Sequence, residues 1–146
     1  MTAKDLTPTN TSQSLIIPGF RYRNAPAAIE WLCNAFGFTK HAVYPGANDT
    51  IAHAQLTFGN GIIMLGSVHE GGAGYQIKHP DELSGASTLS IYVIVSDADA
   101  HYARAKAAGA AIIREVRDED YGGRGYSCCD LESYPWSFGT YNPWQS

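Results

Sequence analysis

The chain has 146 residues, of which 45% are hydrophobic and 16% charged, and its formal net charge is −4. A chain of this length can bury a substantial core as a single domain. The negative balance argues against a nucleic-acid surface, and no basic run or basic amphipathic helix suggests a membrane surface.

Residues 1–14 are polar and rich in threonine, and we expect them to form a flexible leader. They lack the apolar core of a signal peptide, and no apolar run approaches the roughly 20 residues of a membrane span. The three cysteines, Cys33, Cys128 and Cys129, form no Cys-x-x-Cys motif, which favours a reducing setting over a disulfide framework. We therefore expect a cytoplasmic protein in which Cys128 and Cys129 are small strand residues, with a reactive thiol as the alternative.

The first half of the chain predicts one strand, one helix and three further strands. A strand is expected at 15–23. Asn24 is a plausible N-cap for the helix that follows, and Gly37 supplies its C-terminal stop. The apolar stripe of this helix is Ile29, Leu32, Cys33 and Phe36. Strands are then expected at 39–44, 51–58 and 61–67, the last two joined by a tight turn at 59–61.

The second half repeats this order after a segment, 69–86, that has glycines, a proline and no sustained period, and that we interpret as a linker or a lid. A strand is predicted at 87–95. Ser96 and Asp99 resemble a capping box, and an Ala-rich helix at 97–108 stops at Gly109. Strands at 111–116, 124–129 and 135–141 complete the chain, with a turn at 130–133 between the last two.

Sliding the first half by 72 residues places it on the second, so that Gly37 falls on Gly109 and Met64-Leu65 on Trp136-Ser137. This pattern repeat predicts a single α+β domain at 15–142. It would contain two βαβββ modules, 15–68 and 87–142, joined by the linker 69–86. Together they would form a curved mixed sheet around a central cleft.

Three stretches carry a family resemblance: Asn24 to Leu32, Ile51 to Leu56, and the end of the chain from Tyr121-Gly122-Gly123-Arg124 to Phe138-Gly139-Thr140-Tyr141. In these the chain resembles the vicinal oxygen chelate superfamily of glyoxalases, bleomycin-resistance proteins and extradiol dioxygenases, most closely the PhnB-like and bleomycin-resistance-like branch. The resemblance covers about residues 15–141. It implies a small-molecule cleft and a homodimer, in some members formed by exchanging modules between chains.

Enzymes of that superfamily usually bind a divalent metal through the first and last strands of each module. The corresponding positions here are about Ile17 or Pro18, Leu89 or Ser90, Leu65, and Ser137. None is a histidine or carboxylate, and a divalent site needs several converging N or O ligands. We therefore expect no metal and no other cofactor, with a divalent metal at a relocated site, such as His41 with His53, as the alternative.

Strand alternation identifies the side chains expected to line the cleft. If Ser137 faces the cleft, Trp136 and Phe138 face the helices. The predicted ligand-binding residues are then Arg21, His53, Gln55, Ser127, Ser137 and Tyr141. A sheet face in bulk water would show the same alternation, and a slip of one residue would place Arg124 and Tyr126 in the cleft instead.

The favoured function is a metal-free small-molecule binding protein, one that sequesters a drug-like, aromatic or cationic compound, as in antibiotic resistance. The alternative is a glyoxalase-like lyase or isomerase, or a dioxygenase, with a relocated metal or with His53 as general base. A third hypothesis is a scaffold with a vestigial cleft. The only partners expected are the ligand and a second copy of the chain, with neither nucleic acid nor membrane.

Overall fold

In the computed structural model, residues 12–69 and 77–145 are described; residues 1–11, most of the predicted leader, and 70–76, within the predicted linker, lie outside the described residues. The first half contains β1 (Gly19–Tyr22), α1 (Ala25–Phe36), β2 (Thr39–Pro45), β3 (Ile51–Phe58) and β4 (Gly61–Ser67). The second contains η2 (Pro80–Leu83), β5 (Ile91–Ile94), α2 (Ala98–Ala107), β6 (Ala111–Asp118), β7 (Arg124–Cys129), β8 (Pro135–Gly139) and η3 (Pro143–Gln145).

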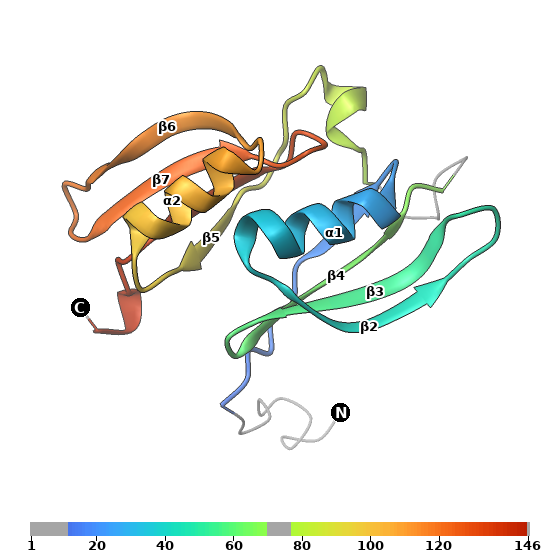
Figure 1. Cartoon of the computed structure of the whole chain (residues 1–146), viewed down its shortest axis with the longest axis horizontal. Coiled ribbons are helices and arrows are strands. Elements are labelled where there is room, and N and C mark those ends of the chain that lie inside the picture. Colours follow the sequence, from blue (N-terminus) through green and yellow to red (C-terminus); the bar gives the residue numbers. More distant parts are fainter. Residues whose placement is uncertain (1–11, 70–76, 146) are drawn as a thin grey trace, which may run out of the picture.

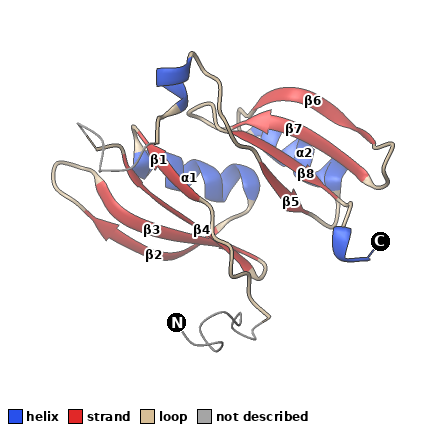
Figure 2. Cartoon of the chain, turned by 180° about the vertical axis from the view of Figure 1, so that it is seen from behind, coloured by secondary structure: helices blue, strands red, loops and turns tan. Residues whose placement is uncertain are grey.

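The fold is α+β and consists of two four-stranded mixed sheets with the orders β1-β4-β3-β2 and β5-β8-β7-β6. In each sheet the first and last strands of the module pair in parallel and the other pairs are antiparallel. Figures 1 and 2 show that both helices lie on the same side of the molecule, each over its own sheet, while the opposite sheet faces carry no helix. We call these uncovered faces the open faces.

Local signals account for most element boundaries. The Asn24 side chain accepts a hydrogen bond from Ala27 N at 3.2 Å, and Gly37 ends α1 at φ +88°. The predicted Ser96 cap is wrong. Asp97 caps α2 instead, because its carboxylate reaches Ala100 N at 3.0 Å.

The strands predicted at 15–23 and 87–95 are shorter in the structure, at Gly19–Tyr22 and Ile91–Ile94. Each is an edge strand with a neighbour on one side only. The paired residues begin at Gly19, directly after Pro18, and at Ile91, so residues such as Leu15 and Leu89 lie outside the ladder and are exposed. No helix in the described part of the chain is long and apolar enough to cross a membrane.

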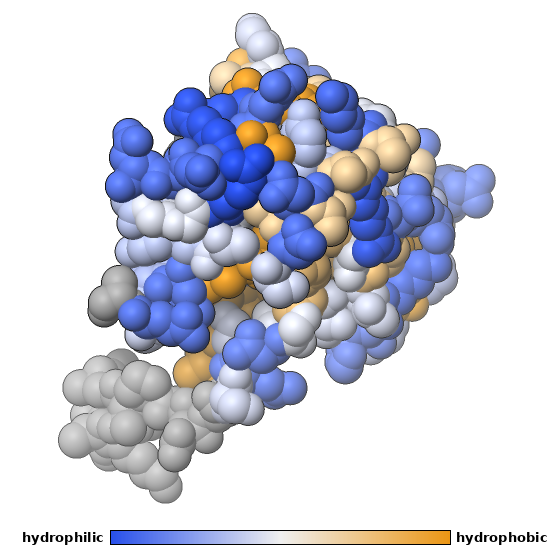
Figure 3. All heavy atoms as spheres, turned by 60° about the vertical axis from the view of Figure 1, so that its left-hand side comes forward, coloured by the Kyte–Doolittle hydropathy of each residue, from blue (hydrophilic) through white to orange (hydrophobic). Residues whose placement is uncertain are grey.

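One continuous core joins the two modules. Trp136 of β8 stacks on Phe20 of β1, with ring centroids 5.1 Å apart, and also contacts Phe36 of α1 at 5.2 Å. The helices contact each other directly, since Trp31 Nε1 donates to Ala108 O at 2.7 Å. On the side of the second module, hydrophilic side chains surround an area where hydrophobic ones reach the surface (Figure 3). The buried core is thus shared by both modules, while apolar side chains such as Ile16 and Leu89 remain exposed.

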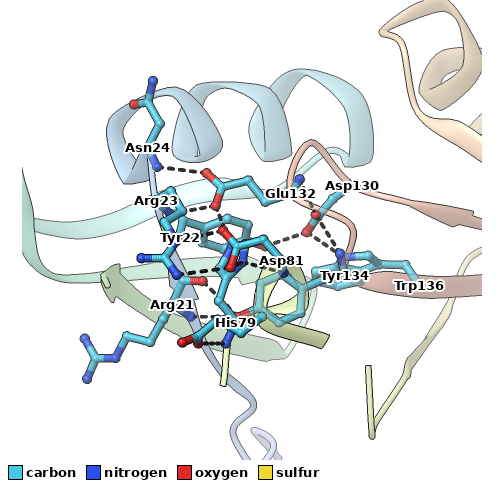
Figure 4. A network of polar contacts seen from close by, with 11 residues as sticks. Arg21, Tyr22, Arg23, Asn24, His79, Asp81, Asp130, Glu132, Tyr134 and Trp136 are labelled. Atoms are coloured by element: carbon cyan, nitrogen blue, oxygen red, sulfur yellow. Dashed lines mark hydrogen bonds and ion pairs between the residues drawn. The ribbon is translucent and has the colours of Figure 1, made fainter. Parts of the chain in front are cut away.

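The turn between β7 and β8 forms a polar junction with β1, shown in Figure 4. Asp130 is 5% exposed and its carboxylate accepts four hydrogen bonds. The donors are Tyr22 Oη at 2.6 Å, Trp136 Nε1 at 3.0 Å, and the backbone N–H groups of Glu132 and Tyr134 at 2.9 and 3.1 Å. Burial raises the pKa of Asp130, and these four donors oppose that shift.

Glu132 extends the junction to α1 and to the predicted linker. Its carboxylate accepts from Arg23 N at 2.6 Å and Asn24 N at 2.8 Å, at the start of α1. It also contacts His79 Nε2 at 2.7 Å, while His79 Nδ1 accepts from Asp81 N at 3.1 Å. Since Nδ1 acts as acceptor, Nε2 carries the proton and donates it to Glu132. The end of the linker is therefore held against both modules.

His101 of α2 forms a third junction. Its Nδ1 lies 2.6 Å from Tyr126 Oη and its Nε2 lies 2.8 Å from Phe36 O. Nε2 must donate to the carbonyl, so Nδ1 accepts from the tyrosine. Burial lowers the pKa of His101, against the smaller opposing effect of the Phe36 carbonyl. The neutral ring is the form that fits this junction.

We expect the free energy of unfolding to fall as the pH is lowered through about 6.5, the ordinary histidine pKa. The unfolded ring takes up a proton in this range, whereas the folded ring resists it until a lower pH. The stabilisation is therefore complete above the unfolded pKa and is lost below it. Urea unfolding at several pH values measures this slope. His101→Gln should flatten it, and an unchanged slope in that variant would contradict the assignment.

Candidate functional site

A row of polar side chains crosses the open face of the second sheet. Tyr92 pairs with Ser137, Ser137 with Ser127, and Ser127 with Arg114, so one residue comes from each of β5, β8, β7 and β6. The hydroxyl groups of Ser127 and Ser137 lie 2.7 Å apart. The row follows from alternation, because the flanking residues of β7 and β8 face α2 and are buried.

Three tyrosines surround one end of this row. The Tyr92 hydroxyl donates to Tyr141 O at 2.7 Å, and the rings of Tyr121 and Tyr141 meet edge to face at 5.1 Å. Gly139 makes room for Tyr92, since a Cβ there would come within 2.8 Å of the tyrosine oxygen. Burial raises the pKa of Tyr92, so its hydroxyl remains a donor. The hollow between these groups has a volume of only about 160 Å³.

The other end of the row is an ion pair. Arg114 Nη1 lies 2.5 Å from Glu119 Oε1, and the Glu119 side chain is only 8% exposed. Neither of these two buried atoms has a hydrogen bond to another described residue. This pair neutralises the charge of Arg114 at the end of the row, and the exposed Arg117 lies 4.0 Å from the same carboxylate.

The open face of the first sheet is different in character. Here the equivalent row is Gly19, Met64, Gln55 and Ala42, again one residue per strand. Beside it, Gln55 Nε2 lies 3.1 Å from His53 Nε2, and the ring of Tyr44 stacks on His53 with centroids 6.1 Å apart. Met64 adds an adaptable apolar surface.

Arg21 completes this face. It pairs with Gly66 of β4, and its guanidinium lies over that glycine, where a Cβ would come within 2.5 Å of Nη1. Figure 4 shows the Arg21 guanidinium pointing away from the polar junction. In the described ranges neither an ion pair nor a hydrogen bond involves this guanidinium; only the Arg21 backbone is bonded, to Tyr134 Oη.

The six predicted site residues thus divide between two sheets. Arg21, His53 and Gln55 are on the first open face, Ser127 and Ser137 are on the second, and Tyr141 follows β8. In the described part of the chain, no hydrogen bond or ring contact joins the two groups. The alternative register, which would expose Tyr126 and Arg124, is not the one observed: Tyr126 is fully buried, and Arg124 is paired with Asp99 and Asp118.

The predicted equivalence of Leu65 with Ser137 is wrong by one residue. Leu65 is 3% exposed and faces α1, whereas Met64 faces the open side. Ala54 and Tyr126 are 72 residues apart, but their partners Leu65 and Phe138 are 73 apart. The connection from Tyr126 to its partner Phe138 is therefore one residue longer than the connection from Ala54 to its partner Leu65.

The comparisons with known proteins agree on the architecture. The family profile described as Glyoxalase/Bleomycin resistance protein/Dioxygenase superfamily matches residues 17–138. The chain belongs to this superfamily. An uncharacterised protein of Mycobacterium bovis is 28% identical over 116 residues, 80% of this chain and 76% of that protein.

Solved structures of the superfamily are similar to it. TioX from Micromonospora sp. ML1 is 33% identical with a TM-score of 0.67, over 86% of this chain and 94% of that one. The fosfomycin resistance protein FosX from Listeria monocytogenes is 13% identical with a TM-score of 0.66, over 92% and 98%. At that identity FosX shows the shared fold only.

The divalent metal of the superfamily's enzymes does not fit the side chains present here. None of the positions expected for it on the first strands, Ile17 or Pro18 and Leu89 or Ser90, is a histidine or carboxylate. On the open faces the first and last strands pair Gly19 with Met64 and Tyr92 with Ser137. A thioether and two hydroxyl groups are a poor donor set for a divalent cation. Within residues 12–69 and 77–145, the polar and ring partners of His53 are Gln55 and Tyr44, and no group of three or more His, Cys, Asp or Glu could hold a metal.

The cysteines offer no activated nucleophile. Burial raises the pKa of Cys128 to about 12, and the pKa values of Cys33 and Cys129 are also raised by burial. The thiolate is the reactive form, so each of these thiols is held in its unreactive state.

Two larger hollows lie in the seam between the modules, along the edge strands β1 and β5. One has a volume of about 660 Å³ and is lined by Ile63, Val93 and Trp136 among others. The other, of about 690 Å³, is lined by Gly19, Leu89 and Tyr134 among others. Both fall within the range of small-molecule sites, roughly 300–1,000 Å³. Tyr92 lines both the first of these and the small hollow on the second open face.

Sequence reasoning missed Tyr92, Arg114 and Glu119. Tyr92 was detectable, because it is the one aromatic residue in an otherwise aliphatic edge strand. Arg114 and Glu119 carried no such signal, since β6 departs from regular pairing with β7 on both sides of Arg114.

Proposed function

We propose that this protein is a metal-free small-molecule binding protein of the bleomycin-resistance-like, PhnB-like type, which sequesters an aromatic, drug-like compound. The observation that carries this is the seam hollow of about 660 Å³, whose largely apolar wall meets the polar row of the second sheet at Tyr92. An apolar pocket with a few polar groups at its edge is the usual form of a ligand site. Sequestration in the cytoplasm would confer resistance to the bound compound.

We further propose that the working form is a homodimer. The edge strands β1 and β5 each have a free side in the described sheets. Apolar side chains beside them are exposed, notably Ile16 at 87% and Leu89 at 71%. Exposed apolar area of this kind marks an interaction surface. Sedimentation of the full chain tests this part of the proposal.

Filling the seam hollow should abolish ligand binding. Val93 lines it, so Val93→Trp places a large ring in the space a ligand would use. We expect aromatic compounds that raise the melting temperature of the wild type to lose this effect in Val93→Trp. Ile113→Trp is the matched control, because Ile113 is 59% exposed and lies outside this lining.

Metal analysis of the same preparations separates binding from catalysis. The proposal expects substoichiometric Zn, Ni, Mn and Fe and no turnover of a hemithioacetal or a catechol. Stoichiometric metal with turnover would instead establish the lyase, isomerase or dioxygenase alternative. A wild type that binds no aromatic compound in a broad panel would indicate a vestigial cleft.

A further inference from the structure

The open face of the first sheet carries an arginine and no acidic strand residue, in an acidic protein. None of the four strands β1 to β4 contains Asp or Glu, and Arg21 lies on the open face, whereas Lys40 pairs with the buried Leu56 on the helix side. The net charge of the whole chain is −4. Two neighbouring carboxylates are already paired, Glu30 with Lys40 and Asp81 with Arg23, while Asp49 lies in the exposed turn between β2 and β3. This face therefore has a local field that attracts anions.

Arg21 supplies that charge, and its position is fixed through its backbone rather than through the N–H groups of its guanidinium. Its backbone is fixed by the parallel pairing with Gly66 and by both hydrogen bonds to Tyr134 Oη, at 3.3 and 2.8 Å. The absence of a side chain at Gly66 lets the guanidinium lie against the sheet. Five N–H donors in a planar fork are thus available on a half-buried surface, which is the arrangement that binds carboxylates and sulfonates.

The surroundings extend this site in two directions. On one side, His53, Gln55 and Tyr44 offer further polar groups on the same face. On the other, Gly19 precedes Arg21 on the same face and lines the seam hollow of about 690 Å³. Lys78 lines that hollow too, and its other walls include Leu83, Leu89 and Tyr134; none of the described residues that line it is a carboxylate.

We propose that Arg21 is an anion-binding residue and that the ligand is an aromatic compound carrying a carboxylate or sulfonate. The flat apolar body would lie in the seam hollow of about 690 Å³, which is distinct from the hollow of about 660 Å³ lined by Val93. The anionic group would accept hydrogen bonds from Arg21, with Lys78 as a second cation. This inference rests on the proposed binding function and narrows it, because a cationic ligand would be repelled by this face.

Two fluorescent probes that share one ring system test the idea. 8-Anilinonaphthalene-1-sulfonate carries the anion, and N-phenyl-1-naphthylamine lacks it. We expect the wild type to bind the sulfonate roughly tenfold tighter, as a charge-assisted hydrogen bond on a half-buried surface allows. Arg21→Gln should remove this preference and leave the affinity for the neutral probe within about twofold. High salt should weaken the binding of the sulfonate alone.

Control variants separate position from net charge. Lys106→Gln removes one positive charge from the exposed surface of α2 and should change neither affinity. Gly66→Ala keeps the charge but places a Cβ where the guanidinium lies, and should weaken the sulfonate as Arg21→Gln does.

Each outcome is decisive. Equal affinities for both probes, unaffected by Arg21→Gln, would overturn the anion site and leave the proposed binding function standing. Equal losses in Arg21→Gln and Lys106→Gln would also overturn it, as an effect of net charge. If neither probe binds the wild type, both proposals fail.

Discussion

Replacing Asp130 with alanine is expected to lower the free energy of unfolding by about 3 kcal/mol or more. The substitution leaves four donors without their acceptor, and the two side chains among them, Tyr22 and Trp136, are fully buried. Each unsatisfied buried donor costs about 1–3 kcal/mol. The raised pKa of Asp130 shows that burying this carboxylate has its own cost, and removing it gives part of the loss back. With four donors involved, the lost hydrogen bonds outweigh that gain.

Urea unfolding of three variants tests this account. Asp130→Asn keeps the volume and one oxygen but presents an amide N–H₂ toward donors, so we expect an intermediate loss. Asp120→Ala removes an exposed carboxylate and should stay within about 0.5 kcal/mol of the wild type. A loss in Asp130→Ala no larger than that in Asp120→Ala would mean that the junction does not stabilise the fold.

Much of the fold was predictable because its signals are local. The Asn24 cap, the Gly37 stop and the two-residue turn at Gly59-Asn60 fix α1, β3 and β4 to within a residue. The sequence signals were misleading at the edge strands, where apolar residues precede the paired residues of β1 and β5. They also failed at Ser96, where two adjacent capping residues competed and Asp97 reached the backbone N–H.

Which residues of the candidate site lie on the open faces was predictable, but which residues correspond between the two modules was not. Alternation assigns Ser127, Ser137, His53 and Gln55 to the open faces, since the residues between them are buried. Leu65 was misplaced because a single fixed shift of 72 residues cannot reproduce a difference in connection length between the modules. That Ser127, Ser137, His53 and Gln55 bind a ligand remains a prediction.

The placement of the modules against each other could not be read from the sequence. It depends on contacts between residues about 110 positions apart, such as the Asp130 and Glu132 carboxylates with Tyr22 and Asn24. His79 and His101 gave no spacing signal, because each bonds to a distant element rather than to a neighbouring ligand. Such junctions depend on donors and acceptors that come together only when the two modules pack against each other.

Trp136→Ala should destabilise both modules together, by about 3–5 kcal/mol. Trp136 belongs to β8 but packs against Phe20 and Phe36 of the first module, and it has no exposed surface. Its removal opens a cavity at the boundary of the two modules, and takes away a donor to Asp130 as well. Since a small domain is stable by only about 5–15 kcal/mol, this variant should lie close to the unfolding threshold.

Unfolding followed by two probes distinguishes a shared core from two separate ones. If the core is shared, far-ultraviolet circular dichroism and the fluorescence of Trp31, which bridges α1 and α2, should change in one transition at a lower urea concentration. Trp144→Ala is the matched control, because Trp144 is 91% exposed and its loss should leave the midpoint unchanged. Two separate transitions in Trp136→Ala, with only one shifted, would show that each module folds on its own core. The prediction of a single domain would then be wrong, and the seam hollows would lie between independent bodies rather than within one rigid site.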